Sequence, residues 1–72
     1  MFDLRPVFAS RNDGAPAFYS AQLGLLRPAN VFRVPGTKLW RIELYGRWAL
    51  WLKAPHPASL DDCRIWLRQN LR

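Results

Sequence analysis

Apolar and polar residues alternate along two neighbouring stretches of the chain, 38–44 and 48–53, and this pattern predicts a β-hairpin. Residues 45–47 interrupt the alternation and form its loop, because a shorter loop would mix apolar and polar side chains on both faces. The apolar cross-strand pairs in this register are Leu44 with Trp48, Ile42 with Leu50, and Trp40 with Leu52. We expect Arg41 and Trp51 to lie beside each other on the opposite face.

The chain before this hairpin contains one more predicted strand, at residues 31–34. It is followed by Pro35 and Gly36, which suit the two central positions of a type II turn. Near the N-terminus, residues 1–14 hold a short apolar run that Pro6 interrupts. Since proline is confined to sheet edges, we expect this segment to be either an edge strand or an arm lying across the core.

A first helix is predicted over residues 16–26, where apolar residues follow helical spacing. Asp13 is a candidate cap, and Pro16 suits the first turn, where a missing N–H costs nothing. Gly24 weakens the last turn, and Pro28 prevents the helix from continuing.

A second helix is predicted over residues 59–72, with Ser59 as its cap and Asp62 completing a short-armed capping box. Ile65 lies away from the apolar stripe that faces the core. That stripe consists of Leu60, Cys63, Leu67 and Leu71, with Trp66 at its edge. The sequence therefore predicts one small α+β domain over residues 1–72. It is a three-stranded antiparallel meander packed by the C-terminal helix, in the order α-β-β-β-α.

The composition limits what this domain can be. The chain has 72 residues, half of them hydrophobic, which is too apolar for a disordered segment. The single cysteine and single histidine exclude a disulfide framework and the usual zinc sites, and nothing in the sequence calls for a cofactor. No apolar run approaches the roughly 20 residues that span a bilayer. We therefore expect a soluble, cytoplasmic protein.

Charge points to a class of partner. Eleven basic residues against five acidic ones give a net charge of +6, and nine of the eleven are arginines. Arginine pairs bidentately with phosphates and stacks on flat rings, so this balance is typical of nucleic-acid binders. A coding bias of the genome toward arginine would produce the same composition in a protein that does not bind nucleic acid.

Outward-facing basic and aromatic residues of the predicted sheet form the candidate binding surface, because stacking rings and cations together hold nucleic acid. A second track runs along the C-terminal helix, where cations also stabilise the helix dipole. Two alternatives remain for the outward Trp51: the N-terminal arm covers its side chain, or the side chain packs in a homodimer interface. The sheet set is Arg33, Arg41, Arg47, Trp51 and Lys53, and the helix set is Arg64 and Arg68, with Arg72 beyond them.

Candidate catalytic residues are few. Asp61 and Asp62 are adjacent on a helix, so their side chains diverge, and helix capping explains them. Cys63 falls on the buried stripe, where a small core residue is expected. His56 stands between two prolines without an orienting partner nearby in sequence. We therefore expect a protein that is not an enzyme, and a ribonuclease acting through His56 is the minor alternative.

The predicted element order resembles that of double-stranded-RNA-binding domains and of their small relatives, the HicA-type mRNA-cleaving toxins. The resemblance covers residues 20–71 and includes the turn at 34–37, residues 55–57, and the spaced apolar residues of the last helix. Because Lys38 stands where those toxins have a histidine, the resemblance implies their fold and not their nuclease activity.

Two functions follow from these observations. The first is non-catalytic nucleic-acid binding through an arginine- and tryptophan-bearing sheet face. The second is a phage or mobile-element interaction module that inhibits a host protein complex, since tryptophan and arginine also dominate protein interfaces.

Overall fold

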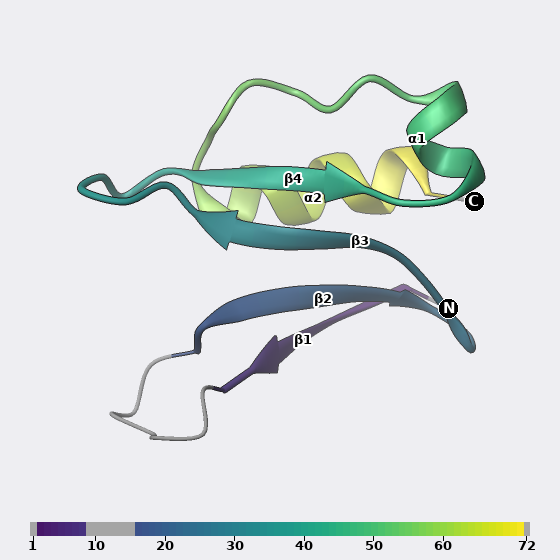
Figure 1. Ribbon diagram of the computed structural model, residues 1–72, viewed down its shortest axis with the longest axis horizontal. Helices are drawn as coiled ribbons and strands as arrows, with labels where there is room; N and C mark the ends of the chain where they lie inside the picture. Colours follow the sequence, from purple (N-terminus) through teal and green to yellow (C-terminus); the bar gives the residue numbers. More distant parts are fainter. Residues whose placement is uncertain (1, 9–15, 72) are drawn as a thin grey trace.

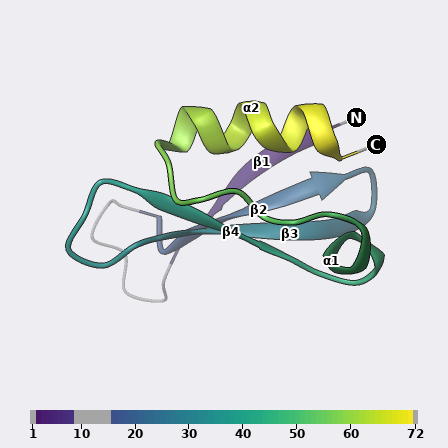
Figure 2. The same cartoon turned by 90° about the horizontal axis from the view of Figure 1, so that it is seen from above.

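The computed structural model describes residues 2–8 and 16–71, which form a four-stranded antiparallel sheet and two helices. The strands lie in the sheet in chain order, and α2 packs along one face of it (Figures 1 and 2). The small α+β architecture is confirmed, whereas the order α-β-β-β-α is wrong. The elements are β1 (Phe2–Val7), β2 (Phe18–Leu23), β3 (Leu26–Arg33), β4 (Trp40–Leu44), α1 (Arg47–Trp51) and α2 (Leu60–Asn70).

The core lies between α2 and the sheet face that it covers (Figure 2). Ala21 and Ala29 are direct partners on β2 and β3, and their small side chains let the helix approach the middle of the sheet closely. Trp40, Trp48 and Trp66 pack around this centre, as expected for three of the four tryptophans. The buried hydrophobic residues of this core are Ala21, Ala29, Val31, Ile42, Cys63, Leu67 and Leu71.

Helix α2 matches its prediction closely. The side chain of Ser59 accepts a hydrogen bond of 3.1 Å from the backbone N–H of Asp62, which is the predicted cap. Cys63 and Leu67 are buried, whereas Ile65 is 53% exposed. The short-range signals of capping and helical spacing therefore defined this helix without help from the rest of the fold.

We expect Ser59→Ala to destabilise the domain by about 1 kcal/mol, because the N–H of Asp62 loses its acceptor. In a domain of this size the melting temperature falls by about 4–8 °C for that loss. Thermal unfolding followed by circular dichroism measures the shift. Ser59→Asn keeps an acceptor and serves as the control, and equal melting of both variants would show that the cap contributes nothing.

The predicted first helix at 16–26 is wrong, because this stretch forms β2, a turn and the start of β3. Residues 18–23 pair with β1 on one side and with β3 on the other, and these partners decide the conformation. Gly24 adopts a φ of +64° in the intervening turn, a conformation that favours glycine. Pro16 therefore precedes a strand, and the proposed cap Asp13 lies outside the described residues.

The predicted hairpin partner at 48–53 is also wrong, since these residues begin in α1 instead of a third meander strand. Gly46 has a φ of +60° at the start of this helix and turns the chain out of the sheet. Trp40 pairs with Ala58 through two backbone hydrogen bonds of 2.7 and 3.0 Å, so a later segment occupies the position predicted for Leu52. Trp51 is consequently not a neighbour of Arg41.

Two other turn and edge features agree with the sequence. Gly36 has a φ of +76°, and the N–H of Thr37 donates to the carbonyl of Val34, which closes the predicted turn at Pro35 and Gly36. Strand β1, which contains Pro6, lies at an edge of the sheet, the first of the two alternatives for the N-terminal segment. Residues 9–14 lie outside the described part.

Candidate binding surface on the open face of the sheet

The face of the sheet opposite α2 has no helix running along it in the described part of the chain (Figure 2). Side chains of paired residues share a face, so the register identifies those that point to this side. We call this set the open face: Asp3, Arg5 and Val7 of β1, Phe18, Ser20 and Gln22 of β2, Asn30 and Phe32 of β3, and Arg41 and Glu43 of β4.

Two aromatic rings and a guanidinium stack on the open face. The ring centroids of Phe18 and Phe32 are 5.1 Å apart, with 30° between the ring planes. The guanidinium carbon of Arg41 lies 4.8 Å from the centroid of Phe32. Such stacks present flat, half-buried apolar surface next to a positive charge. Neither phenylalanine was a candidate in the sequence analysis.

Hydrogen bonds hold the neighbouring side chains in place. Glu43 accepts from Nη1 of Arg41 at 3.0 Å and from the hydroxyl of Tyr45 at 2.6 Å. Asn30 in turn donates from Nδ2 to the Tyr45 oxygen at 3.2 Å. The Tyr45 bond, followed by that of Arg41, holds the pKa of Glu43 below its ordinary value, while burial and the bond to Glu43 raise the pKa of Tyr45. The network fixes Arg41 above Phe32.

We expect Tyr45→Phe to raise the pKa of Glu43 toward its ordinary 4.5, because the largest cause of the lowered pKa disappears. A lowered folded-state pKa stabilises the fold above the unfolded-state pKa, and that contribution is lost as the pH falls through the folded-state pKa. Tyr45→Phe therefore makes the free energy of unfolding depend less on pH in the acid range. NMR titration of the Glu43 carboxyl in the wild type and in Tyr45→Phe measures the two pKa values, and identical titration curves would contradict the hydrogen bond.

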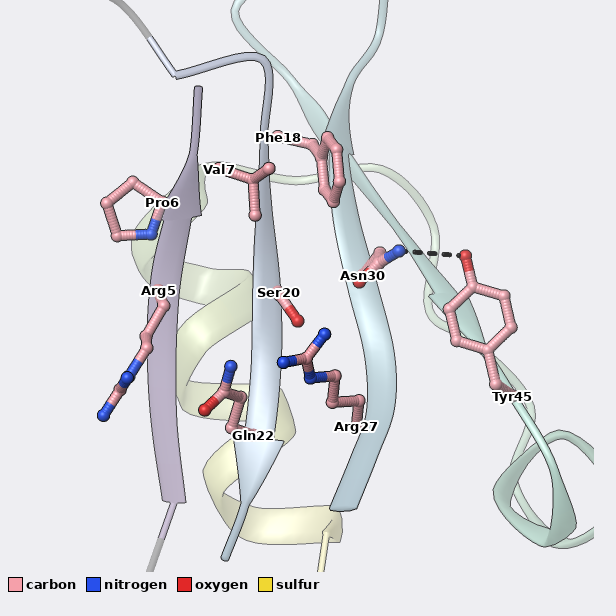
Figure 3. A pocket seen from close by; sticks show the side chains of 9 residues that line it. All are labelled: Arg5, Pro6, Val7, Phe18, Ser20, Gln22, Arg27, Asn30 and Tyr45. Atoms are coloured by element: carbon pink, nitrogen blue, oxygen red, sulfur yellow. Dashed lines mark hydrogen bonds between the residues drawn. The ribbon is translucent and has the colours of Figure 1, made fainter. Parts of the chain in front are cut away.

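A hollow of about 390 Å³ opens beside the stacked rings. Figure 3 shows that Arg27 extends from β3 toward Ser20 and Gln22, whereas the Arg5 guanidinium points away from Arg27. Val7 and Phe18 form an apolar wall. The full lining consists of Arg5, Pro6, Val7, Phe18, Ser20, Gln22, Arg27, Asn30 and Tyr45.

A β-bulge brings Arg27 to this face. Ala21 pairs with Ala29 and Leu23 pairs with Leu26, so Gln22 alone stands opposite two residues of β3, Arg27 and Pro28. In an unbroken strand, Arg27 would share the covered face with Ala29. Bulges often redirect a side chain in this way. Arg27 therefore joins Gln22 and Ser20 at the hollow.

The residues predicted as one sheet surface are separated in the structure. Arg41 is on the open face, as expected, but Arg47 and Trp51 belong to α1 and the exposed Lys53 follows it. Arg33 lies at the end of β3, where its Nε donates to the carbonyl of Thr37 at 3.0 Å in the turn. The predicted surface of these residues is therefore wrong as a unit.

The helix track is separated from the open face as well, because α2 covers the other side of the sheet (Figure 2). Arg64 forms an ion pair of 2.9 Å with Asp61, and Arg68 is exposed in the last turn. Arg72 lies outside the described residues. Arg64 and Arg68 thus have the positions expected of a solvated helix face.

Helix α1 carries its own exposed aromatic cluster. Trp51 is 72% exposed and Leu50 is 84% exposed, so the N-terminal arm does not cover Trp51 in the described residues. The Arg47 guanidinium lies 4.7 Å from the ring of Trp48 and 5.7 Å from that of Trp51. The expected exposure of Trp51 is confirmed, although its position on the sheet is not.

The candidate catalytic residues occupy separate places. Cys63 is buried with its thiol 3.5 Å from the carbonyl oxygen of Trp40, and burial raises its pKa. His56 is exposed in the segment before α2, and Asp61 and Asp62 stand in the first turn of that helix. Within residues 2–8 and 16–71, no three His, Cys, Asp or Glu side chains group as metal ligands would. No helix in those ranges is long and apolar enough to cross a membrane.

Comparisons with known proteins add no relative: no family model, curated protein or solved structure matches this chain. The α-β-β-β-α order that carried the resemblance to RNA-binding domains and HicA-type toxins is not the order found. The open face and the α1 cluster are therefore the features from which a function can be argued.

Proposed function

We propose that this chain is a non-catalytic binding protein that takes single-stranded nucleic acid on the open face of its sheet. The observation that carries the proposal is the stack of the half-buried Phe18 and Phe32 with Arg41, because aromatic rings on a sheet face are a common platform for unpaired bases. Every base has a flat apolar surface, so such a platform tolerates many sequences.

Charge supports the same ligand. The open face and its hollow contain Arg5, Arg27 and Arg41 against the carboxylates of Asp3 and Glu43, which leaves one net positive charge. The whole chain has a net charge of +6, which attracts a polyanion from a distance. A single strand with splayed bases suits these stacked rings better than a duplex, whose bases are stacked and inaccessible to the rings.

The test is fluorescence anisotropy with a labelled short oligonucleotide, single-stranded or as a duplex, over a salt series. We expect tighter binding of the single strand and an affinity that falls steeply between about 50 and 200 mM salt, because bound phosphates release counterions. Absence of binding at about 50 mM salt, or binding that ignores salt, would contradict the proposal.

The α1 cluster favours a second candidate, an interaction module that inhibits a host protein complex, as a phage or mobile-element protein would. Exposed Leu50 and Trp51 beside Arg47 have the composition of protein-interface hot spots. The candidates differ in where a substitution acts. If a protein partner binds at α1, Trp51→Ala abolishes its binding and Phe32→Leu does not. Nuclease treatment then leaves the capture of that partner unchanged.

A further inference from the structure

The hollow beside the stacked rings has the lining of a small-molecule site. Its volume of about 390 Å³ lies within the range of ligand pockets, which are typically about 300–1,000 Å³. One side is apolar, from Val7 and Phe18, and the other carries the side-chain amides of Gln22 and Asn30 (Figure 3). A flat heterocycle with donors and acceptors on its edge requires this combination of surfaces.

Arg27 supplies the charge in this hollow. The described residues contain ion pairs for Arg5, Arg41 and Arg64, and none for Arg27. Its guanidinium extends over β2 toward Ser20, a polar residue only 7% exposed (Figure 3). A guanidinium and a hydroxyl converging on one point provide donors for phosphate oxygens.

The backbone is shaped to place Arg27 there. The bulge opposite Gln22 interrupts the pairing of β2 with β3, and it is the feature that turns Arg27 from the covered face to the open one. Pro28, the next residue, is fully buried and lacks an N–H, so it fixes the bulge without leaving an unpaired donor. The sheet itself thus sets the face from which the Arg27 side chain leaves the backbone.

We infer that this hollow binds one nucleotide, with the base between Phe18 and the amides of Gln22 and Asn30, and the phosphate at Arg27 and Ser20. The inference rests on the proposed function and makes it specific, since it gives one position on the open face where a base and its phosphate are both recognised. The same chemistry is present in a free mononucleotide and in one unit of a strand.

The test is an NMR titration of the ¹⁵N-labelled protein with each of the four nucleoside 5′-monophosphates, the matching nucleosides, and inorganic phosphate. Arg27→Gln removes the proposed phosphate ligand. Arg68→Gln is the matched control, because it removes the same charge from an exposed arginine on the opposite layer. A short oligonucleotide is titrated in parallel to separate a free nucleotide from a strand.

We expect at least one nucleotide to shift the amide signals of Ser20, Gln22 and Asn30, and its nucleoside to bind about tenfold more weakly. Arg27→Gln should weaken the nucleotide by about tenfold, since a hydrogen bond between charged groups is lost. Arg68→Gln should change it by less than about twofold. The oligonucleotide should follow the same order.

Three outcomes overturn the inference. The first is an equal loss of nucleotide affinity in Arg27→Gln and Arg68→Gln. The others are a nucleoside, or inorganic phosphate, that binds as tightly as the nucleotide. If any of these occurs while the oligonucleotide still binds, the proposed function stands and only the nucleotide site fails. If the nucleotide binds at the hollow and the oligonucleotide does not bind, the site stands and the single-strand proposal fails.

Discussion

Replacing Leu67 by alanine is expected to leave a large fraction of the protein unfolded at 25 °C. Leu67 is fully buried on the face of α2 that packs against the sheet, and such truncations cost about 2–5 kcal/mol. A core of this size rarely supplies more than about 3–5 kcal/mol, so the loss consumes nearly all of the stability. Urea denaturation followed by circular dichroism measures it.

Ile65→Ala is the matched control for this prediction, because the residue lies on the same helix and is 53% exposed. Its truncation should change the free energy of unfolding by no more than about 0.5 kcal/mol. Similar losses for Ile65 and Leu67 would mean that α2 does not present the face to the sheet that the structure shows.

Phe32→Leu is expected to weaken single-stranded oligonucleotide binding by about 1–3 kcal/mol, the usual contribution of one stacked base. Leucine keeps apolar surface against Phe18 and so preserves the fold, but it removes the ring against which Phe18 and Arg41 stack. Anisotropy at constant salt measures the affinity, and thermal melting of the same samples verifies that the domain remains folded.

Trp51→Leu is the control for this substitution, since it removes an exposed ring that lies on α1 and not on the open face. We expect the Trp51→Leu protein to bind the oligonucleotide with the same affinity as the wild type. The reverse result, with Trp51→Leu weakened and Phe32→Leu unchanged, would move the nucleic-acid surface from the sheet to α1.

The parts of the fold that the sequence predicted correctly are those with short-range signals. Ser59 and the apolar spacing after it define α2 from within one segment, and Pro35 with Gly36 defines a turn from two residues. Each signal specifies a conformation that the local backbone adopts regardless of its partners.

The parts that failed depend on partners distant in sequence. Residues 18–23 satisfy helical spacing and strand alternation equally, and pairing with both β1 and β3 decides for the strand. Residues 48–53 alternate as a strand would, but Ala58 occupies the edge of β4 beside Trp40 instead. Neither competition can be resolved from residues within the segment itself.

The candidate site was missed for the same reason. Phe18 was assigned to a helix, so its proximity to Phe32 required a strand pairing that had not been predicted. Arg27 reaches the open face only through a bulge, which leaves no mark in the alternation of the sequence. Among the predicted binding residues in the described part of the chain, Arg41 alone lies on the open face, because its strand was identified correctly.

The strands of this protein follow one another in the sheet in the same order as in the chain. Each strand pairs with its neighbour in sequence, so the sheet closes few long loops and can assemble quickly. The helix that covers its apolar face comes last. During synthesis on the ribosome, Ala21, Ala29, Val31 and Ile42 therefore have no covering helix until residues 60–70 emerge, and this interval is when the nascent chain is most exposed to aggregation.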